Sequence, residues 1–146
     1  MLYHVPDPAR AVAELSRVVR PGGTVLVVLN GADHMDTYRS LVAEAAGRDK
    51  WLPIPSDTMN LGHGALLRET FAAVALDELR GSIVLRDIDP LVRYATSARD
   101  FYEHEVDGSW ADFETRLAEV AHRHLDRQGR IEITTHSGVF VCTAAA

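Results

Sequence analysis

The most constraining feature of the sequence is a helix, a tight turn and an apolar strand that follow one another within its first 30 residues. Asp7 before Pro8 predicts a helix start, because Asp caps free backbone N–H groups and Pro lacks only a donor that the first helical position leaves unused. Pro21-Gly22-Gly23 ends the helix. Thr24–Leu29 is a β-branched run without alternation, which is typical of a strand covered on both faces in a parallel sheet. This pattern indicates an α/β protein.

The rest of the chain continues with helical and strand patterns. Helices are expected at about 33–46, from Asn60 to Phe71, at 89–104 and at 109–128. Strands are expected at 74–79, 131–134 and 139–142, with His136-Ser137-Gly138 as the break between the last two. The 146 residues, 47% hydrophobic and 25% charged, fit a single domain over 1–146. The expected fold class is therefore α/β with three or so strands.

Composition excludes several classes of partner. The net charge of −6, with Arg residues scattered among acids, argues against a nucleic-acid partner, because phosphate binding needs a basic stripe. No apolar segment approaches the ~20 residues that span a bilayer, so no membrane association is expected. Cys142 stands alone in an apolar run, which fits a buried thiol in a reducing compartment. We therefore expect a soluble cytoplasmic protein.

The stretch MLYHVPDPARAVAELSRVVRPGGTVLVVLNG resembles the middle of the class I S-adenosylmethionine-dependent methyltransferases, in the branch that acts on small molecules. In that family a strand ending in a Leu-Tyr-His-like motif leads into Val-Pro-Asp, an amphipathic helix, an Arg-Pro-Gly-Gly turn and the next central strand. GALLRETFAAV, DPLVRYATS and SGVFVCTA also look like the C-terminal part of such enzymes. The resemblance implies the C-terminal half of a Rossmann-like, doubly wound sheet with helices on both faces, beginning at the end of the fourth strand.

The same resemblance implies S-adenosylmethionine as cofactor, held over the first strands beside a glycine-rich turn. The chain has no Gly-x-Gly-x-Gly turn, and Gly62-His63-Gly64 follows Leu61 in a loop region before the wrong helix. We therefore expect weak or no cofactor binding by these residues alone. The chain is interpreted as the C-terminal portion of such an enzyme, from a gene model that starts too late, a fragment or a true short protein. Whether it is itself an enzyme stays open.

The expected strand Thr24–Leu29 would normally pair with the fourth strand of the family's sheet. Without that neighbour it presents unpaired N–H and C=O groups beside apolar side chains, which predicts a homo-oligomer formed through the exposed sheet edge. A non-catalytic remnant or interaction domain that associates through this edge is thus the alternative to small-molecule methyl transfer. A third alternative is a different α/β enzyme that shares only the Pro-Gly-Gly turn.

Candidate site residues follow from the resemblance. His4 is the candidate catalytic residue, since it matches the position where the family's cofactor and substrate meet; packing or capping before Pro6 is its alternative role. A structural role is likewise the alternative for the aromatic and histidine candidates. No Cys cluster or His-Glu motif predicts a metal site, and the sequence does not specify the substrate or the methylated atom. The cofactor-binding candidates are Met1, Leu2, Tyr3 and His4, and the substrate-binding candidates are Asn30, His34, Trp51 and Tyr94.

Overall fold

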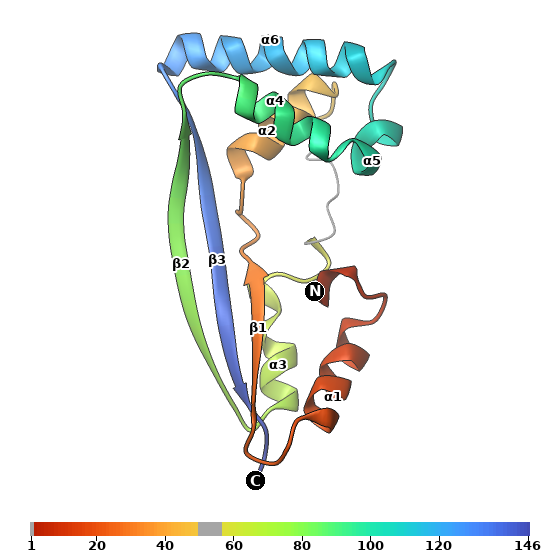
Figure 1. Ribbon diagram of the computed structural model, residues 1–146, viewed down its shortest axis with the longest axis vertical. Helices are drawn as coiled ribbons and strands as arrows, with labels where there is room; N and C mark the ends of the chain where they lie inside the picture. The colour runs from red at the N-terminus through yellow and green to blue at the C-terminus, as the bar shows by residue number, and fades with distance from the viewer. Residues whose placement is uncertain (1, 50–56) are drawn as a thin grey trace. The chain divides into compact units, whose positions relative to one another are not determined.

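The structure is a computed structural model that describes residues 2–49 and 57–146, and it confirms the α/β class (Figure 1). Among the described residues, no helix is both long enough and apolar enough to cross a membrane. The elements in chain order are η1 Leu2–His4, α1 Pro8–Val18, β1 Thr24–Asn30, α2 Asp36–Ala45, η3 Leu61–His63, α3 Gly64–Thr70, β2 Ala73–Leu85, α4 Asp89–Ser97, α5 Arg99–Tyr102, η4 Glu103–Glu105, α6 Trp110–Gln128 and β3 Ile131–Thr143.

The three strands form one sheet in the order β1-β3-β2. β1 pairs antiparallel with β3 in an unbroken register, from Thr24 opposite Thr143 to Asn30 opposite Ser137. Figure 1 shows β2 and β3 running in opposite directions as well. The expectation that the Thr24–Leu29 strand belongs to a parallel ladder is therefore wrong in the described part of the chain, because an apolar run does not specify the direction of the neighbouring strand. β1 lies at one edge of the sheet.

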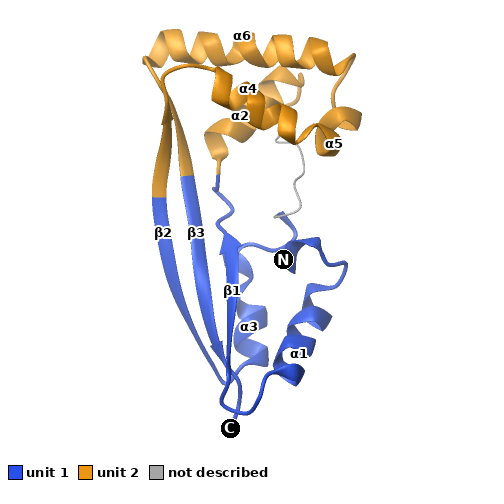
Figure 2. Cartoon of the chain, in the orientation of Figure 1, with its two compact units in different colours: residues 1–34, 54–80, 135–146 blue, residues 35–53, 81–134 orange. Residues whose placement is uncertain are grey.

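Two compact units divide the chain (Figure 2). The first comprises residues 1–34, 54–80 and 135–146, and the second comprises 35–53 and 81–134. Strands β2 and β3 contribute residues to both units. The single domain over 1–146 stays a prediction.

The first unit has a core built where α1, α3 and the sheet meet. Asp7 caps α1 as predicted, since its carboxylate accepts a hydrogen bond from the Arg10 N–H at 3.0 Å. Gly64 opens α3 so close to the sheet that a Cβ there would lie 2.9 Å from the ring of Phe140. The buried cluster consists of Val12, Val27, Leu29, Met59, Leu67, Phe71, Phe140 and Cys142.

The two faces of β1 differ sharply in burial. Val27 and Leu29 point into this core, whereas Leu26 and Val28 are each 64% exposed. Side chains alternate along a strand, so one face of β1 is covered and the other is open. The expectation that this strand is covered on both faces is wrong for Leu26 and Val28.

The second unit is organised around α6, which packs against α2 and α4. Its predicted start is confirmed: the Ser109 hydroxyl accepts from the Asp112 N–H at 3.2 Å, and the Asp112 carboxylate accepts from the Ser109 N–H at 3.3 Å. Gly129 ends the helix with a φ of 71°. The buried residues of α6 are Trp110, Phe113, Leu117, Val120 and Ala121.

The helix expected at 89–104 is interrupted at Ala98, between α4 and α5. Before this break, the hydroxyls of Thr96 and Ser97 donate to the carbonyls of Val92 and Tyr94 at 3.0 and 2.7 Å. Such side-chain bonds to the backbone compete with helical hydrogen bonds. One long helix is therefore replaced by α4, α5 and η4.

Two further expectations are corrected near the ends of the chain. Leu2–His4, interpreted as the end of a strand, forms a 3-10 helix in which the Val5 N–H donates to the Leu2 carbonyl at 3.3 Å. A strand needs hydrogen bonds to a neighbouring strand, whereas the bond from Val5 to Leu2 closes a local turn. His136-Ser137-Gly138, interpreted as a break, lies inside the continuous strand β3.

Candidate functional site

A polar site forms where β1 leaves the sheet. The Gly31 N–H donates to the His136 carbonyl at 3.0 Å and so extends the β1–β3 ladder by one residue. The chain then turns, and the His34 N–H donates back to the Gly31 carbonyl at 3.1 Å. Beside this turn the Asn30 side-chain oxygen accepts from the Ser137 hydroxyl at 2.9 Å. The segment after β1 is thus attached to β3 by both backbone and side chains.

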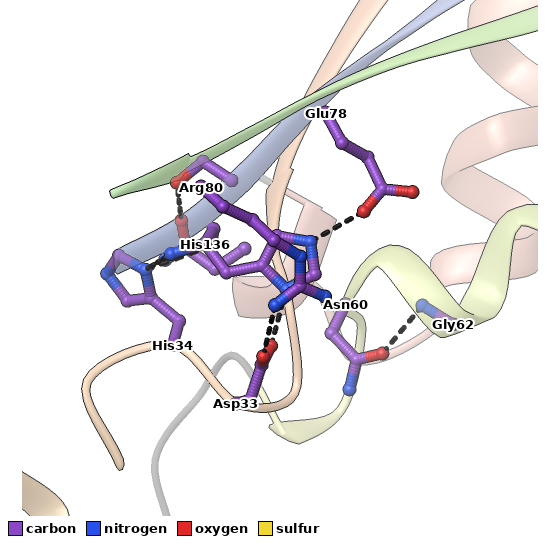
Figure 3. A network of polar contacts seen from close by, with 9 residues as sticks. Asp33, His34, Asn60, Gly62, Glu78, Arg80 and His136 are labelled. Atoms are coloured by element: carbon purple, nitrogen blue, oxygen red, sulfur yellow. Dashed lines mark hydrogen bonds and ion pairs between the residues drawn. The ribbon is translucent and has the colours of Figure 1, made fainter. Parts of the chain in front are cut away.

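Four charged or titratable side chains, which we call the His136 cluster, meet at this point: Asp33, Glu78, Arg80 and His136 (Figure 3). His136 Nδ1 contacts the Asp33 carboxylate, and its Nε2 lies 2.6 Å from the Glu78 carboxylate. The Arg80 guanidinium donates to the second Asp33 oxygen at 2.6 Å. Glu78 and Arg80 are two positions apart on β2, so they share a face of the strand. The His136 side chain is only 7% exposed, while its charged partners reach solvent.

Charge pairing decides the protonation of this cluster. Hydrogen bonds from His136, and next from Arg80, lower the pKa of Asp33 from 3.8 to about 2. Hydrogen bonds to Asp33, and next to Glu78, raise the pKa of His136 above its ordinary 6.5 despite burial. When His136 is protonated, its charge and that of Arg80 balance the two carboxylates. Each ring nitrogen of His136 lies against a carboxylate, so this residue is poorly placed to act as a general base.

His34 occupies the position where a ladder carbonyl would normally sit. Its Nδ1 lies 3.1 Å from the His136 N–H and 2.9 Å from the His136 carbonyl. That carbonyl already accepts from Gly31, whose own carbonyl is taken by the His34 N–H. The His34 side chain therefore takes the ladder position that the Gly31 carbonyl leaves vacant, and it attaches the turn to the backbone of His136.

The structure brings two of the predicted substrate-binding residues together. Asn30 and His34 contact neighbouring residues of β3, namely Ser137 and His136. Tyr94 lies in the second unit, on α4, where it is 50% exposed and its ring meets that of Tyr38 edge-on at 5.0 Å. The fourth candidate, Trp51, lies outside the described residues.

The predicted catalytic and cofactor-binding residues lie in η1. His4 is exposed, and its ring centroid is 4.5 Å from that of Tyr3. The Tyr3 carbonyl accepts from the Thr58 hydroxyl at 3.1 Å. Leu2 lines an apolar groove between α1 and β1. Met1 lies outside the described residues, and the roles proposed for these four positions stay predictions.

Sequence reasoning missed all four members of the His136 cluster. Glu78 is 58 residues from His136, and Asp33 is 103 residues away, so no local motif joins them. One signal was present: Asp33 follows the end of a predicted strand, where a doubly wound sheet places its ligands. Because residues 136–138 are interpreted as a break between strands, the sequence does not indicate that His136 contacts Asp33 and Glu78.

The described residues do not fit an S-adenosylmethionine cradle by themselves. The Gly62-His63-Gly64 segment is used structurally: Asn60 caps it through the Gly62 N–H at 2.9 Å, and Gly64 packs on Phe140. The Gly62 N–H, which a phosphate-binding turn would offer to its ligand, is thus already used by Asn60. Within residues 2–49 and 57–146, no group of three or more His, Cys, Asp or Glu is arranged to hold a metal ion.

Comparison with known proteins supports the sequence-based interpretation. Residues 1–27 match the family model described as a methyltransferase domain. The resemblance to methyltransferases is confirmed over this segment. A search among curated proteins finds no match.

The fold has relatives among solved structures. The crystal structure of the YcgJ protein from Bacillus subtilis matches 99% of this chain with a TM-score of 0.50 and 14% sequence identity. Phosphoethanolamine N-methyltransferase 2 of Haemonchus contortus, solved with phosphomonomethylethanolamine and S-adenosylhomocysteine, matches 99% with a TM-score of 0.43 and 14% identity. The chain spans 61% of the YcgJ chain and 32% of the second. The likeness to YcgJ supports the fold.

Proposed function

We propose that this chain is the C-terminal, substrate-side part of an enzyme that transfers a methyl group from S-adenosylmethionine to a small molecule. The observation that carries the proposal is the match of residues 1–27 to the methyltransferase domain. The structure agrees with that resemblance in having helix α1, the Pro21-Gly22-Gly23 turn and strand β1 in order. The activity is that of the longer protein, since the chain spans 61% of its solved relative YcgJ.

The polar site at the end of β1 gives the chain's own contribution to such a reaction. Ligands of doubly wound sheets bind outside the carboxyl ends of the strands, and Asn30, His34 and Glu78 lie at the carboxyl end of β1 or beside it. Methyl transfer from a sulfonium needs mainly alignment, which hydrogen bonds from such side chains supply. His4 stays the candidate catalytic residue on the ground of the resemblance. His136 does not replace it in that role, because both ring nitrogens of His136 are engaged.

Cofactor binding in this proposal depends on residues beyond these 146. The chain contains no Gly-x-Gly-x-Gly turn, and its one Gly-x-Gly segment, Gly62-His63-Gly64, leads into α3 with Gly64 packed on Phe140. Leu2, Tyr3 and His4, with Met1, supply at most the edge of a cofactor site. The same proposal includes a cytoplasmic location and no nucleic-acid partner, in line with the net charge of −6.

The second candidate function is a non-catalytic interaction domain that forms homo-oligomers through β1. It is favoured by the edge position of β1 and by the open apolar side chains of Leu26 and Val28. An apolar groove of about 600 Å³ also borders this edge. Its lining residues are Leu2, Ala11, Glu14, Leu15, Val18 and Val25–Val28.

Titration calorimetry with S-adenosylhomocysteine separates the two functions. The 146-residue chain is compared with a version extended upstream in its reading frame. The enzyme proposal predicts micromolar binding by the extended version and little or none by the shorter one. A stop codon directly upstream, or an extended version that binds no cofactor, would favour the interaction domain.

A further inference from the structure

The His136 cluster ties together three segments that are distant in the sequence. Asp33 belongs to the turn after β1, Glu78 and Arg80 belong to β2, and His136 belongs to β3. All four lie in the first unit. The backbone of His136 also contacts this turn, through Gly31 and His34. The turn that carries the site is thus attached to His136 through both its backbone and its ring.

We propose that His136 is a protonation-dependent clamp, which in its imidazolium form fixes residues 31–34 and the Glu78 carboxylate at the end of β1 and releases Glu78 when it loses its proton. The clamp is a property of the first unit and does not require cofactor or substrate. That Glu78 and His34 face a substrate rests on the proposed function.

The number of N–H donors on the His136 ring makes the clamp depend on protonation of that ring. An imidazolium donates from both nitrogens, and each nitrogen of His136 faces a carboxylate. A neutral ring donates from one nitrogen only, so its other lone pair would face an oxygen of like charge. One of the two carboxylates must then move away.

Glu78 is the carboxylate that leaves. Asp33 keeps a second partner in Arg80, at 2.6 Å, whereas the one polar side-chain partner of Glu78 among the described residues is His136. Glu78 is also the more exposed of the two carboxylates, at 45% against 39%, so water replaces its lost bond readily. Other groups facing the ring do not take over: Arg80 is a cation, and His34 contacts only the backbone of His136.

Nitrogen-15 NMR of the full 146-residue chain tests the clamp directly. Below pH 6 both ring nitrogens of His136 are expected to show imidazolium shifts, and the ring is expected to titrate above pH 6.5. The backbone amides of Gly31, Asp33, His34 and Glu78 should shift with the same midpoint. A His136 midpoint at or below pH 6.5, or amides that stay fixed while the ring titrates, would overturn the proposal.

Charge variants separate a clamp from a merely structural histidine, because they move the titration midpoint in opposite directions. Asp33→Asn and Glu78→Gln should each lower the midpoint of His136, whereas Arg80→Gln should raise it, since a nearby cation disfavours the imidazolium. Asp77→Asn is the matched control: it removes an exposed carboxylate from the neighbouring position of β2 and should leave the midpoint unchanged. A titration midpoint of His136 that is the same in all three cluster variants as in the unaltered chain would refute the clamp. If Asp33→Asn fails to fold, the opposite shifts of the Glu78 and Arg80 variants still decide.

These measurements need neither cofactor nor substrate, so their outcome is independent of the calorimetry above. A confirmed clamp in a protein that never binds S-adenosylhomocysteine would leave the inference standing and remove the proposed function. If the extended version binds S-adenosylhomocysteine but His136 does not behave as a clamp, the proposed function stands and the inference about the clamp is wrong.

Discussion

The imidazole of His136 lies so close to Gly31 that a Cβ at position 31 would be 2.0 Å from its Nδ1. No real side chain is accommodated at that distance. The glycine at the end of β1 is therefore a packing requirement of the buried histidine, and the two residues, 105 positions apart in the sequence, form one structural unit.

Gly31→Ala should destabilise the protein by about 1–3 kcal/mol, the usual cost of overpacking a filled site. Urea unfolding of the single variants and of the double variant with His136→Ala measures this. The added Cβ would also lie 2.6 Å from the Asp33 carboxylate, but that side chain is partly exposed and loses its His136 partner in the double variant. Gly31→Ala should therefore cost less when His136 is already Ala. Equal costs in both backgrounds would show that the contact does not explain the glycine.

Stability should depend on pH through the His136 cluster on both sides of a plateau. Asp33 has a pKa lowered from 3.8 to about 2, so its contribution is present above pH 3.8 and is lost as pH falls toward 2. His136 has a raised pKa, so its contribution is full below 6.5 and is lost as pH rises through the raised value. The stability difference between the unaltered chain and Asp33→Asn should therefore be largest between about pH 4 and 6.5. Asp77→Asn serves as control, and a difference that is constant across pH would contradict the charge pairing.

Ser109→Ala should lower the free energy of unfolding by about 1 kcal/mol, because it removes the cap of α6 and leaves the Asp112 N–H without its partner. Denaturant unfolding followed by circular dichroism measures the loss. Glu119→Gln, an exposed change within the same helix, should stay within about 0.5 kcal/mol of the unaltered chain. A cap variant that behaves like this control would rule out the capping role.

Val28→Lys should reduce self-association if β1 is the associating edge, since a charge beside an open strand discourages pairing with another chain. Light scattering over a range of protein concentrations measures the effect. Leu79→Lys puts the same charge on an exposed position of β2, 76% exposed, and should leave association unchanged. If the unaltered chain is a monomer at high concentration, the expected self-association through β1 is wrong.

The parts of the fold predictable from sequence are those decided by neighbouring residues. Asp7-Pro8 and Ser109 with Asp112 specify helix starts through hydrogen bonds that span three residues, and the structure has both. The edge position of β1 was also predicted, from the resemblance. Its pairing direction was not, because direction depends on how β3 returns after a helix of 19 residues.

The candidate site was only half predictable. Asn30 and His34 were found because they follow a recognisable strand. His136 was hidden because Gly138 suggested a turn, yet a Cβ at that glycine would lie 2.9 Å from the Leu61 side chain and 3.0 Å from the Asp77 carbonyl. Tertiary crowding, not a turn, thus accounts for the glycine, and single-sequence reasoning has no access to such contacts.

We propose that these residues form the substrate-side part of a methyltransferase whose cofactor contacts lie mostly outside them. Titration calorimetry of S-adenosylhomocysteine into the 146-residue chain, beside its upstream-extended version, tests this proposal. We expect micromolar binding for the extended version and no measurable heat for the shorter chain. Micromolar binding by the 146 residues alone would contradict it.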